Sequence, residues 1–176
     1  FNGYTVGLTL GFVPQGVLAF STDSLLVYGN FSFEPSILFS DNGGQSWKLV
    51  YHQPFNPSAG TNPGIIDLKI SGDGVTGVAV QHEGIIRTSD RGQHWSAVLS
   101  APGHKFEKTS WPAGSFCYAS GGPDIYKSTD GGLHWTDISF HPDSGNEDFK
   151  NIFFTNTNTG YCSEAVTSAI YRTTDG

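Results

Sequence analysis

Apolar side chains in this sequence come in short runs, and most of these runs alternate with polar or small residues. Residues 16–20 and 77–81 are typical. Gly, Asn, Asp and Pro separate the runs, and no segment repeats its apolar residues with a helical period. The pattern predicts an all-β protein with strands at 16–20, 25–28, 36–39, 47–51, 66–70, 77–81, 84–88, 95–99, 106–111, 115–120, 124–128, 135–139, 149–155, 160–164 and 169–173.

One motif recurs along the chain, Ile-x-x-[Ser/Thr]-x-[Asp/Asn]-x-Gly-x-x-Trp. Its acidic position is Asn42, Asp90, Asp130 and Asp175, at intervals of 48, 40 and 45 residues. A repeat of this length with four short strands per copy is typical of propeller blades. We therefore predict a partial β-propeller of about four blades, each a four-stranded antiparallel sheet. The motif positions are Ser40, Asn42, Gly44, Trp47, Thr88, Asp90, Gly92, Trp95, Ser128, Asp130, Gly132, Trp135, Thr173 and Asp175.

Each motif has the chemistry of a hairpin turn. An Asp side chain accepts hydrogen bonds from the backbone of its own turn, and Gly adopts backbone angles that other residues resist. The Trp that opens the next strand can bury its ring between neighbouring sheets. We expect Asp90 and Asp130 to stabilise the fold and to take no part in catalysis.

The motif resembles the Asp-box, or BNR repeat, of β-propellers, from about residue 17 to residue 176. One copy departs from the pattern, because Asn42 stands where Asp is expected. Asp-boxes occur in sialidases, sortilin-type receptors, some endoglucanases and the photosystem II assembly and stability factor family. The spellings at 129–135 and 158–161 are most similar to this last group. The resemblance implies an extracytoplasmic, non-catalytic module that binds a protein or a glycan and serves assembly.

The repeat also predicts how the chain is divided. We expect blades at about 17–51, 65–100, 106–140 and 149–176, with residues 1–16 as a strand of a preceding blade. The last motif stops at Asp175-Gly176, before its Gly-x-x-Trp. We therefore expect residues 1–176 to be a single fragment of a longer propeller, with an incomplete last blade. We expect the fragment to associate through the open edge of that blade unless residues 1–16 cover it.

Composition narrows the function classes. The chain has 23 Gly among 176 residues, few charged side chains and a net charge of −7. Such a charge argues against a nucleic-acid partner or an anionic membrane surface. No apolar run approaches the roughly 20 residues of a membrane span. Metal-ligand spacings, phosphate loops and nucleophile motifs are also absent from the sequence, so we expect no metal and no cofactor.

The loops at the end opposite the motif turns form the candidate binding face. It carries Tyr51, His52, Phe55, His82, Glu83, His104, Asp124, His141, Asp143, Glu147 and Asp148. Five aromatic residues on the loops either form a recognition surface for a protein partner or pack the loops onto their own blades: Phe31, Phe33, Tyr51, Phe55 and Phe140.

The alternative is a carbohydrate-active hydrolase, a glycosidase or a sialidase-like enzyme, whose site is completed by blades outside this chain. Paired carboxylates on the loops would serve a glycosidase. A sialidase needs three converging arginines. Arg87 and Arg172 instead share one repeat position with Lys127, and Arg91 lies in a motif turn, so convergence is not expected.

Two cysteines, Cys117 and Cys162, each lie 13 residues before an acidic motif position. We interpret them as occupants of the same place on the second strands of adjacent blades. Facing sheets pack roughly 10 Å apart, whereas a disulfide needs Cα atoms within about 7 Å. The sequence therefore predicts two separate thiols that fill space between blades.

Overall fold

A computed structural model describes residues 11–54, 64–141 and 147–176, and these form fifteen strands and no helix. Sheet 1 contains β1 (Phe12–Ala19), β2 (Leu25–Phe31), β3 (Glu34–Ser40) and β4 (Lys48–His52). Sheet 2 contains β5 (Asp67–Ile70), β6 (Gly77–Gln81), β7 (Gly84–Thr88) and β8 (Ser96–Ser100). Sheet 3 contains β9 (Lys108–Ala113), β10 (Phe116–Gly121), β11 (Asp124–Ser128) and β12 (Thr136–Asp137). Sheet 4 contains β13 (Phe149–Phe154), β14 (Gly160–Glu164) and β15 (Ile170–Thr173).

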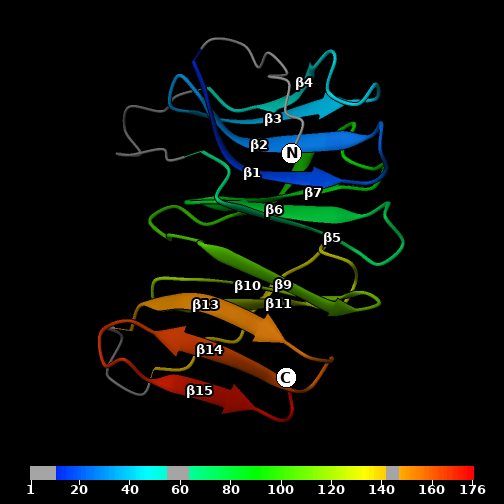
Figure 1. The fold of residues 1–176 in the computed structure, drawn as a ribbon. Coiled ribbons are helices and arrows are strands. Elements are labelled where there is room, and N and C mark those ends of the chain that lie inside the picture. Colours follow the sequence, from blue (N-terminus) through cyan, green and yellow to red (C-terminus); the bar gives the residue numbers. More distant parts are fainter. Residues whose placement is uncertain (1–10, 55–63, 142–146) are drawn as a thin grey trace.

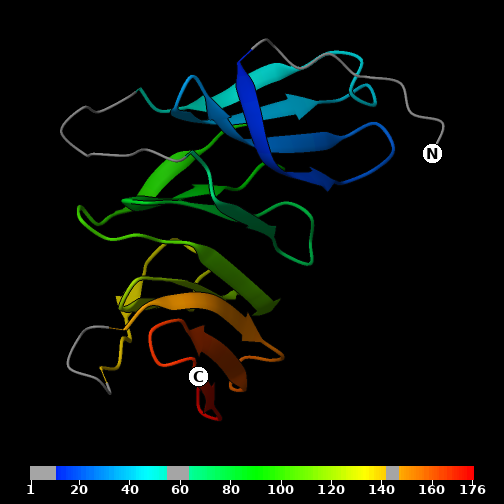
Figure 2. The same ribbon diagram turned by 60° about the vertical axis from the view of Figure 1, so that its left-hand side comes forward.

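Each sheet is an antiparallel meander, and the four sheets follow one another in chain order (Figure 1). The rotated view shows the same succession from sheet 1 to sheet 4 (Figure 2). The first strands of sheets 2, 3 and 4, which are β5, β9 and β13, are neighbours. The protein is thus a partial β-propeller, with three four-stranded sheets and one three-stranded sheet.

The core lies in layers between successive sheets, because neighbouring residues of a strand point to opposite faces. In β7, Ile85 packs toward sheet 3 and Ile86 toward sheet 1, and both are buried. In β11, Tyr126 packs toward sheet 2 and Ile125 toward sheet 4. Each central sheet therefore needs apolar residues on both faces, which explains the near-continuous apolar runs of its inner strands.

Side-chain hydrogen bonds join the first strands of sheets 2, 3 and 4. The Asp67 carboxylate on β5 accepts from the backbone N–H of Thr109 on β9 at 2.9 Å and from the Thr109 hydroxyl at 3.0 Å. The Ser110 hydroxyl accepts from the backbone N–H of Phe154 on β13 at 2.9 Å. These bonds are buried, so they fix the order in which the sheets are stacked as well as their separation.

Most strand ends differ from the sequence prediction by a few residues, and three of the differences have a clear structural cause or consequence. β1 begins at Phe12, and residues 12–14 pair with β2, so this segment belongs to sheet 1 and not to a preceding blade. The prediction for residues 1–10 lies outside the described residues. β9 begins at Lys108, because the backbone of Phe106 bonds instead to the carbonyl of His82. β12 is only two residues long, because Asp137 bonds the backbone N–H of Ser139 at 2.8 Å and turns the chain.

Both cysteines are free and buried, but they do not occupy the same place on their strands. Cys117 pairs with Ser128, whereas Cys162 pairs with Tyr171. Since Tyr126 corresponds to Tyr171, the structural counterpart of Cys162 is Ala119. The turn between β14 and β15 is longer than the turn between β10 and β11. The two cysteines therefore lie at different places on their strands, although each is 13 residues before an acidic motif position. Cys117 packs between sheets 2 and 3 and Cys162 between sheets 3 and 4, so sheet 3 separates the thiols.

Candidate functional site

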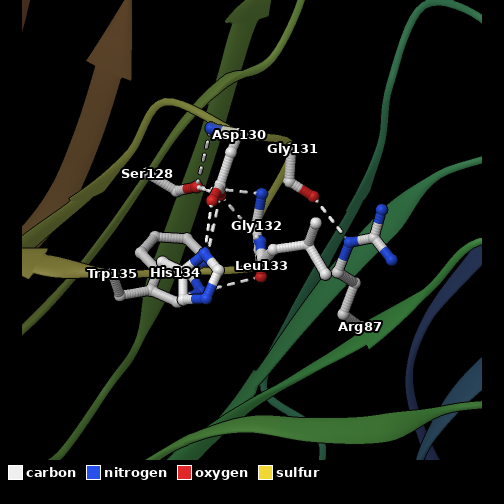
Figure 3. Close-up of polar contacts among 8 residues, drawn as sticks. All are labelled: Arg87, Ser128, Asp130, Gly131, Gly132, Leu133, His134 and Trp135. Carbon is white, nitrogen blue, oxygen red and sulfur yellow. Dashed lines mark hydrogen bonds and ion pairs between the residues drawn. The ribbon is translucent and has the colours of Figure 1, made fainter.

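The motif turns at residues 40–47, 88–95 and 128–135 share one hydrogen-bond pattern, shown for the third turn in Figure 3. Asp130 Oδ1 accepts from the Ser128 hydroxyl at 2.9 Å and from the backbone N–H groups of Leu133 at 3.0 Å and His134 at 2.9 Å. The Ser128 hydroxyl in turn accepts from the backbone N–H of Gly132 at 2.9 Å. Side chains therefore satisfy the polar backbone of a turn that makes few bonds of its own.

The first two turns repeat this arrangement with different residues. Asp90 accepts from the hydroxyl of Thr88 at 2.8 Å and from the backbone N–H of His94 at 2.9 Å. Asn42 accepts from the hydroxyl of Ser40 at 3.0 Å and from the backbone N–H of Ser46 at 2.9 Å. The turn therefore requires an acceptor oxygen at this position but not a negative charge. Asn42, which stands where the other copies have Asp, therefore leaves the hydrogen-bond geometry of the turn intact.

Gly and Trp complete the turn for steric reasons. Gly132 has φ +81°, and a Cβ there would lie 2.5 Å from Val78 on β6 of the preceding sheet. The Trp135 ring packs into the layer between sheets 2 and 3, and its N–H donates to the carbonyl of Gly132 at 3.1 Å. Gly92 and Trp95 behave in the same way between sheets 1 and 2. The second and third motifs thus connect sheets 2 and 3 to the preceding sheet.

Cations reach forward from one sheet to the next motif turn. Arg87 Nε on β7 donates to the carbonyl of Gly131 at 2.7 Å (Figure 3). Lys127 Nζ on β11 donates to the carbonyl of Gly176 at 2.6 Å. Since Gly131 and Gly176 follow the acidic position in their motifs, the two contacts are equivalent. Arg87 and Lys127 therefore link one sheet to the next, which agrees with the structural role predicted for this repeat position.

The carboxylates of Asp90 and Asp130 are held in their charged form, because their pKa values are lowered. The backbone N–H of His134, together with the His134 ring and the Ser128 hydroxyl, holds the pKa of Asp130 well below its ordinary value. Burial raises the pKa of Asp90, but the bonds from His94 and Thr88 outweigh burial and the pKa is lowered. Groups ionised this firmly cannot serve as general acids near neutral pH.

At the opposite end of the sheets, loops from sheets 2, 3 and 4 surround an open pocket of about 740 Å³. We call it the loop-end pocket. Four residues of the predicted binding face meet there: His82, His104, Asp124 and Asp148. The other lining residues are Pro102, Gly103, Lys105, Glu107, Gly122, Pro123 and Lys150. The lining mixes both signs of charge.

His104 and Asp124 form one wall of this pocket. His104 Nδ1 lies 2.6 Å from Asp124 Oδ2. The imidazole ring is stacked on Phe106, with ring centroids 6.1 Å apart, and meets the edge of Tyr126 at 6.0 Å. Phe106 is fully buried, so the aromatic contacts fix the ring and orient its pairing with Asp124.

Lys150 also lines this pocket. Its Nζ lies 2.7 Å from Glu107 and 2.9 Å from Asp148. Hydrogen bonds from the ammonium group to Glu107 and Asp148 raise the pKa of Lys150 above its ordinary value. Both carboxylates are therefore engaged by one permanent cation.

A buried carboxylate anchors the loop that contributes Asp148 to this pocket. Glu164 at the end of β14 accepts from the backbone N–H of Asp148 at 3.1 Å, of Val166 at 2.7 Å and of Thr167 at 2.6 Å. The Thr167 hydroxyl donates to it at 2.5 Å. These bonds, led by the Thr167 hydroxyl, lower the pKa of Glu164 to about 2. Glu164 thus positions Asp148 at the pocket.

The remaining predicted face residues lie elsewhere. The Tyr51 hydroxyl donates to Gln53 at 3.1 Å beside sheets 1 and 2, and His52 pairs with Glu34. Glu83 accepts from the backbone N–H of Gly103 at 3.3 Å. His141 Nδ1 lies 3.4 Å from the buried Glu147. The predictions for Phe55 and Asp143 fall outside the described residues.

The predicted aromatic surface does not gather in one place. Phe140 packs against Phe149 and Tyr171, with centroids 5.2 Å and 5.1 Å away. Phe31 packs on sheet 1, and Phe33 is exposed in the turn between β2 and β3. The loop-end pocket is therefore polar where an aromatic anchor was expected.

No sequence pattern points to Glu107 and Lys150, which are two of the five Asp, Glu and Lys side chains that line the pocket. They lie 43 residues apart, Glu107 directly before β9 and Lys150 on β13, and neither belongs to the motif. Only the packing of β9 beside β13 brings them together. By contrast, Ser40, Thr88 and Ser128 could be recognised from the sequence, because the motif specifies Ser or Thr at this position.

Within residues 11–54, 64–141 and 147–176, no group of three or more His, Cys, Asp or Glu side chains is arranged as metal ligands would be. The same part of the chain has no helix long and apolar enough to cross a membrane.

No family model and no curated protein matches this sequence. Solved structures do match. An ancestral GH74 enzyme superposes with a TM-score of 0.68 at 18% identity, over 93% of this chain and 23% of the enzyme. The GH74 xyloglucanase from Xanthomonas campestris gives 0.65 at 18% identity, over 87% of this chain and 27% of the enzyme. YCF48 bound to D1 peptide gives 0.55 at 12% identity, over 96% of this chain and 80% of that protein.

These likenesses concern the fold. The chain spans about a quarter of the length of the two GH74 enzymes. Enzymes and a peptide-bound protein share the same architecture, so the fold by itself does not distinguish catalysis from binding. Together with the four stacked antiparallel sheets, the comparisons identify the chain as a partial β-propeller.

Proposed function

We propose that this chain is a non-catalytic propeller module of the Asp-box kind that binds a protein partner through its loop end and serves assembly. The observation that carries the proposal is the set of polar contacts in the loop-end pocket. His104 Nδ1 lies 2.6 Å from the Asp124 carboxylate, and Lys150 engages both Glu107 and Asp148. A polar surface that carries side chains of both charge signs suits recognition of a polar protein surface.

The pairing weighs against acid–base catalysis by the described residues. A glycosidase needs one carboxyl group that stays protonated and a second carboxylate opposite it. In this pocket Lys150 Nζ lies 2.7 Å from Glu107 and 2.9 Å from Asp148, so both carboxylates are engaged by an ammonium group. A carboxyl group here could act on a substrate only after Lys150 moved away.

The alternative is a carbohydrate-active hydrolase completed by other blades. Glu107, Asp124 and Asp148 do line one pocket, and this observation keeps the alternative open. Hydrolysis of xyloglucan or related β-glucan oligosaccharides by the purified chain, lost in the Asp124→Asn variant, would favour it over the binding module.

A photo-crosslinking amino acid at Lys105, which is exposed at the pocket, tests the binding proposal in cells that express the chain. The same amino acid at Arg91, exposed in a motif turn at the other end, is the matched control. We expect one discrete crosslinked protein from position 105 only, and its loss on Lys150→Ala substitution. Crosslinks of equal yield from both positions, or none from position 105, would contradict the proposal.

We also propose an extracytoplasmic location, which rests on the resemblance to exported Asp-box proteins. Fractionation of cells that make the full protein tests it. Recovery in the cytoplasmic fraction would overturn it.

A further inference from the structure

A second polar pocket opens at the motif-turn end of sheets 2 and 3. Its volume is about 470 Å³, and we call it the turn-end pocket. Its lining comes from sheets 2 and 3 and their turns, and each of these sheets packs between two others, so the pocket belongs to the inner part of the stack. Five of its residues carry groups that can contact a ligand: Asp73, Arg87, Trp111, Ser115 and Asp130.

Arg87 is the cation of the turn-end pocket, and the fold uses only part of its guanidinium group. Its Nε donates to the carbonyl of Gly131 at 2.7 Å, and its two terminal Nη groups point away from that carbonyl (Figure 3). Within the described residues, neither Nη group has a hydrogen-bond or ion-pair partner. Lys127 makes the equivalent contact in sheet 3 with a single ammonium group. A lysine therefore suffices to link two sheets, and the arginine adds two further donors at the pocket.

Two carboxylates limit the charge that this pocket can accept. Asp73 Oδ1 accepts from two backbone N–H groups of its own turn, at 2.7 Å and 3.2 Å, whereas its Oδ2 has no hydrogen-bond partner among the described residues. The Ser71 hydroxyl is the main cause of a lowered pKa of Asp73, so Oδ2 is an acceptor at neutral pH. Asp130 is also ionised. A dianion would be repelled by both carboxylates, whereas a single negative charge can pair with Arg87.

Trp111 adds an aromatic ring to the lining. Its indole N–H donates to the carbonyl of Gly114 at 2.8 Å, and its ring packs against the layer between sheets 2 and 3. The ring is therefore fixed in place. Binding pockets commonly combine such an aromatic surface with a few polar groups that orient the ligand.

We infer that the turn-end pocket binds a sugar acid, which is a polyhydroxylated ligand with one carboxylate. The ligand carboxylate would accept two hydrogen bonds from the Nη groups of Arg87, because a guanidinium fork matches a carboxylate. A ligand hydroxyl would donate to Asp73 Oδ2, and the apolar face of the ligand would contact Trp111. The turn-end pocket lies at the other end of the sheets from the loop-end pocket, so the inference does not depend on the proposed protein partner.

Isothermal titration calorimetry with D-galacturonate tests the inference on the 176-residue chain at constant ionic strength. We expect saturable binding at one site. D-galactose lacks the carboxylate and cyclohexanecarboxylate lacks the hydroxyls, so each should bind at least about tenfold more weakly, the loss expected for one charge-assisted or buried hydrogen bond. Absence of saturable binding, or equal affinity for any two of these compounds, would overturn the inference.

Arg87→Lys separates binding from stability. The variant keeps a cation for the Gly131 carbonyl, as Lys127 does for Gly176, but it lacks the fork. We expect at least about tenfold weaker binding of D-galacturonate, while the thermal melting curve stays cooperative. Arg91→Lys is the matched control in an exposed turn position outside the pocket, and its affinity should stay within twofold. Unchanged affinity in Arg87→Lys, or equal losses in both variants, would contradict the assignment.

Two further ligands identify the anion and its source. Sulfate should displace D-galacturonate no better than sodium chloride of the same ionic strength, and stronger displacement would overturn the inference in favour of a general anion site. Digalacturonate that binds more tightly than the monomer would identify a glycan as the source of the acid. Weaker binding would identify the free acid, and either result supports the inference.

Discussion

Asp130 shows at the scale of a residue what the motif contributes. Its Oδ1 accepts three hydrogen bonds within its own turn, two of them from backbone N–H groups, and its Oδ2 lies 2.6 Å from His134 Nδ1. We expect Asp130→Ala to lower the free energy of unfolding by about 1–3 kcal/mol, because these donors lose their acceptor. Denaturant unfolding followed by Trp fluorescence measures the change.

The chain itself provides the control for this prediction. Asn42 forms the same turn without a charge, so Asp130→Asn should retain most of the stability that Asp130→Ala loses. Equal stability of Asp130→Ala and the unaltered chain would refute the structural role of this side chain.

At the scale of the element, Glu164 ties the turn after β14 to the start of β13. Its pKa is about 2 in the folded chain, below the ordinary value of 4.5, because the Thr167 hydroxyl and three backbone N–H groups bond the ionised form. A lowered folded pKa contributes stability above about pH 4.5, and this contribution is lost as the pH falls toward 2. The stability difference between the chain and Glu164→Gln should therefore be largest near neutral pH and shrink across this window.

Chemical denaturation at a series of pH values measures that difference. Thr167→Val removes the largest cause of the lowered pKa, so its acid transition should begin at higher pH than in the unaltered chain. A stability difference for Glu164→Gln that stays constant from pH 7 to pH 2 would contradict the assignment.

At the scale of the whole molecule, the outer face of sheet 4 carries exposed apolar side chains. The first Ile of the motif is buried in sheets 1 to 3, because the following sheet covers it: Ile37 and Ile85 are 0% exposed and Ile125 is 5% exposed. The equivalent residue in sheet 4, Ile170, is 76% exposed. On the same face of sheet 4, Phe153 is 63% exposed. Exposed apolar patches of this kind mark interaction surfaces. We expect concentration-dependent association of the chain.

Static light scattering over a concentration series measures this association, and Ile170→Asp should reduce it by placing a charge on the exposed face. Residues 12–14 pair with β2 and so do not cover β15. A strict monomer at all concentrations would show that this surface does not self-associate.

The sequence by itself determined the strands, the repeat and the turn chemistry. These are local properties. The alternation of apolar and polar residues selects a strand. Within the eight residues of each motif turn, a Ser or Thr, an Asp or Asn, and a Gly supply the hydrogen bonds and the backbone angles that the turn needs. The all-β partial propeller was therefore predictable, and it is confirmed. Predictions that required exact strand ends were less accurate, as with β12, where the Asp137 side chain competes with the ladder.

The tertiary structure decided what depends on pairing between distant segments. The equal spacing of Cys117 and Cys162 suggested equivalent places, but the longer turn after β14 offset them along their strands. The loop-end pocket gathers His82, His104, Asp124 and Asp148 and adds Lys150, whose partner Glu107 is 43 residues away. No local pattern encodes such a contact, because it depends on how β9 and β13 lie beside each other. The sequence thus specified the repeating unit, and the packing of the sheets specified the site.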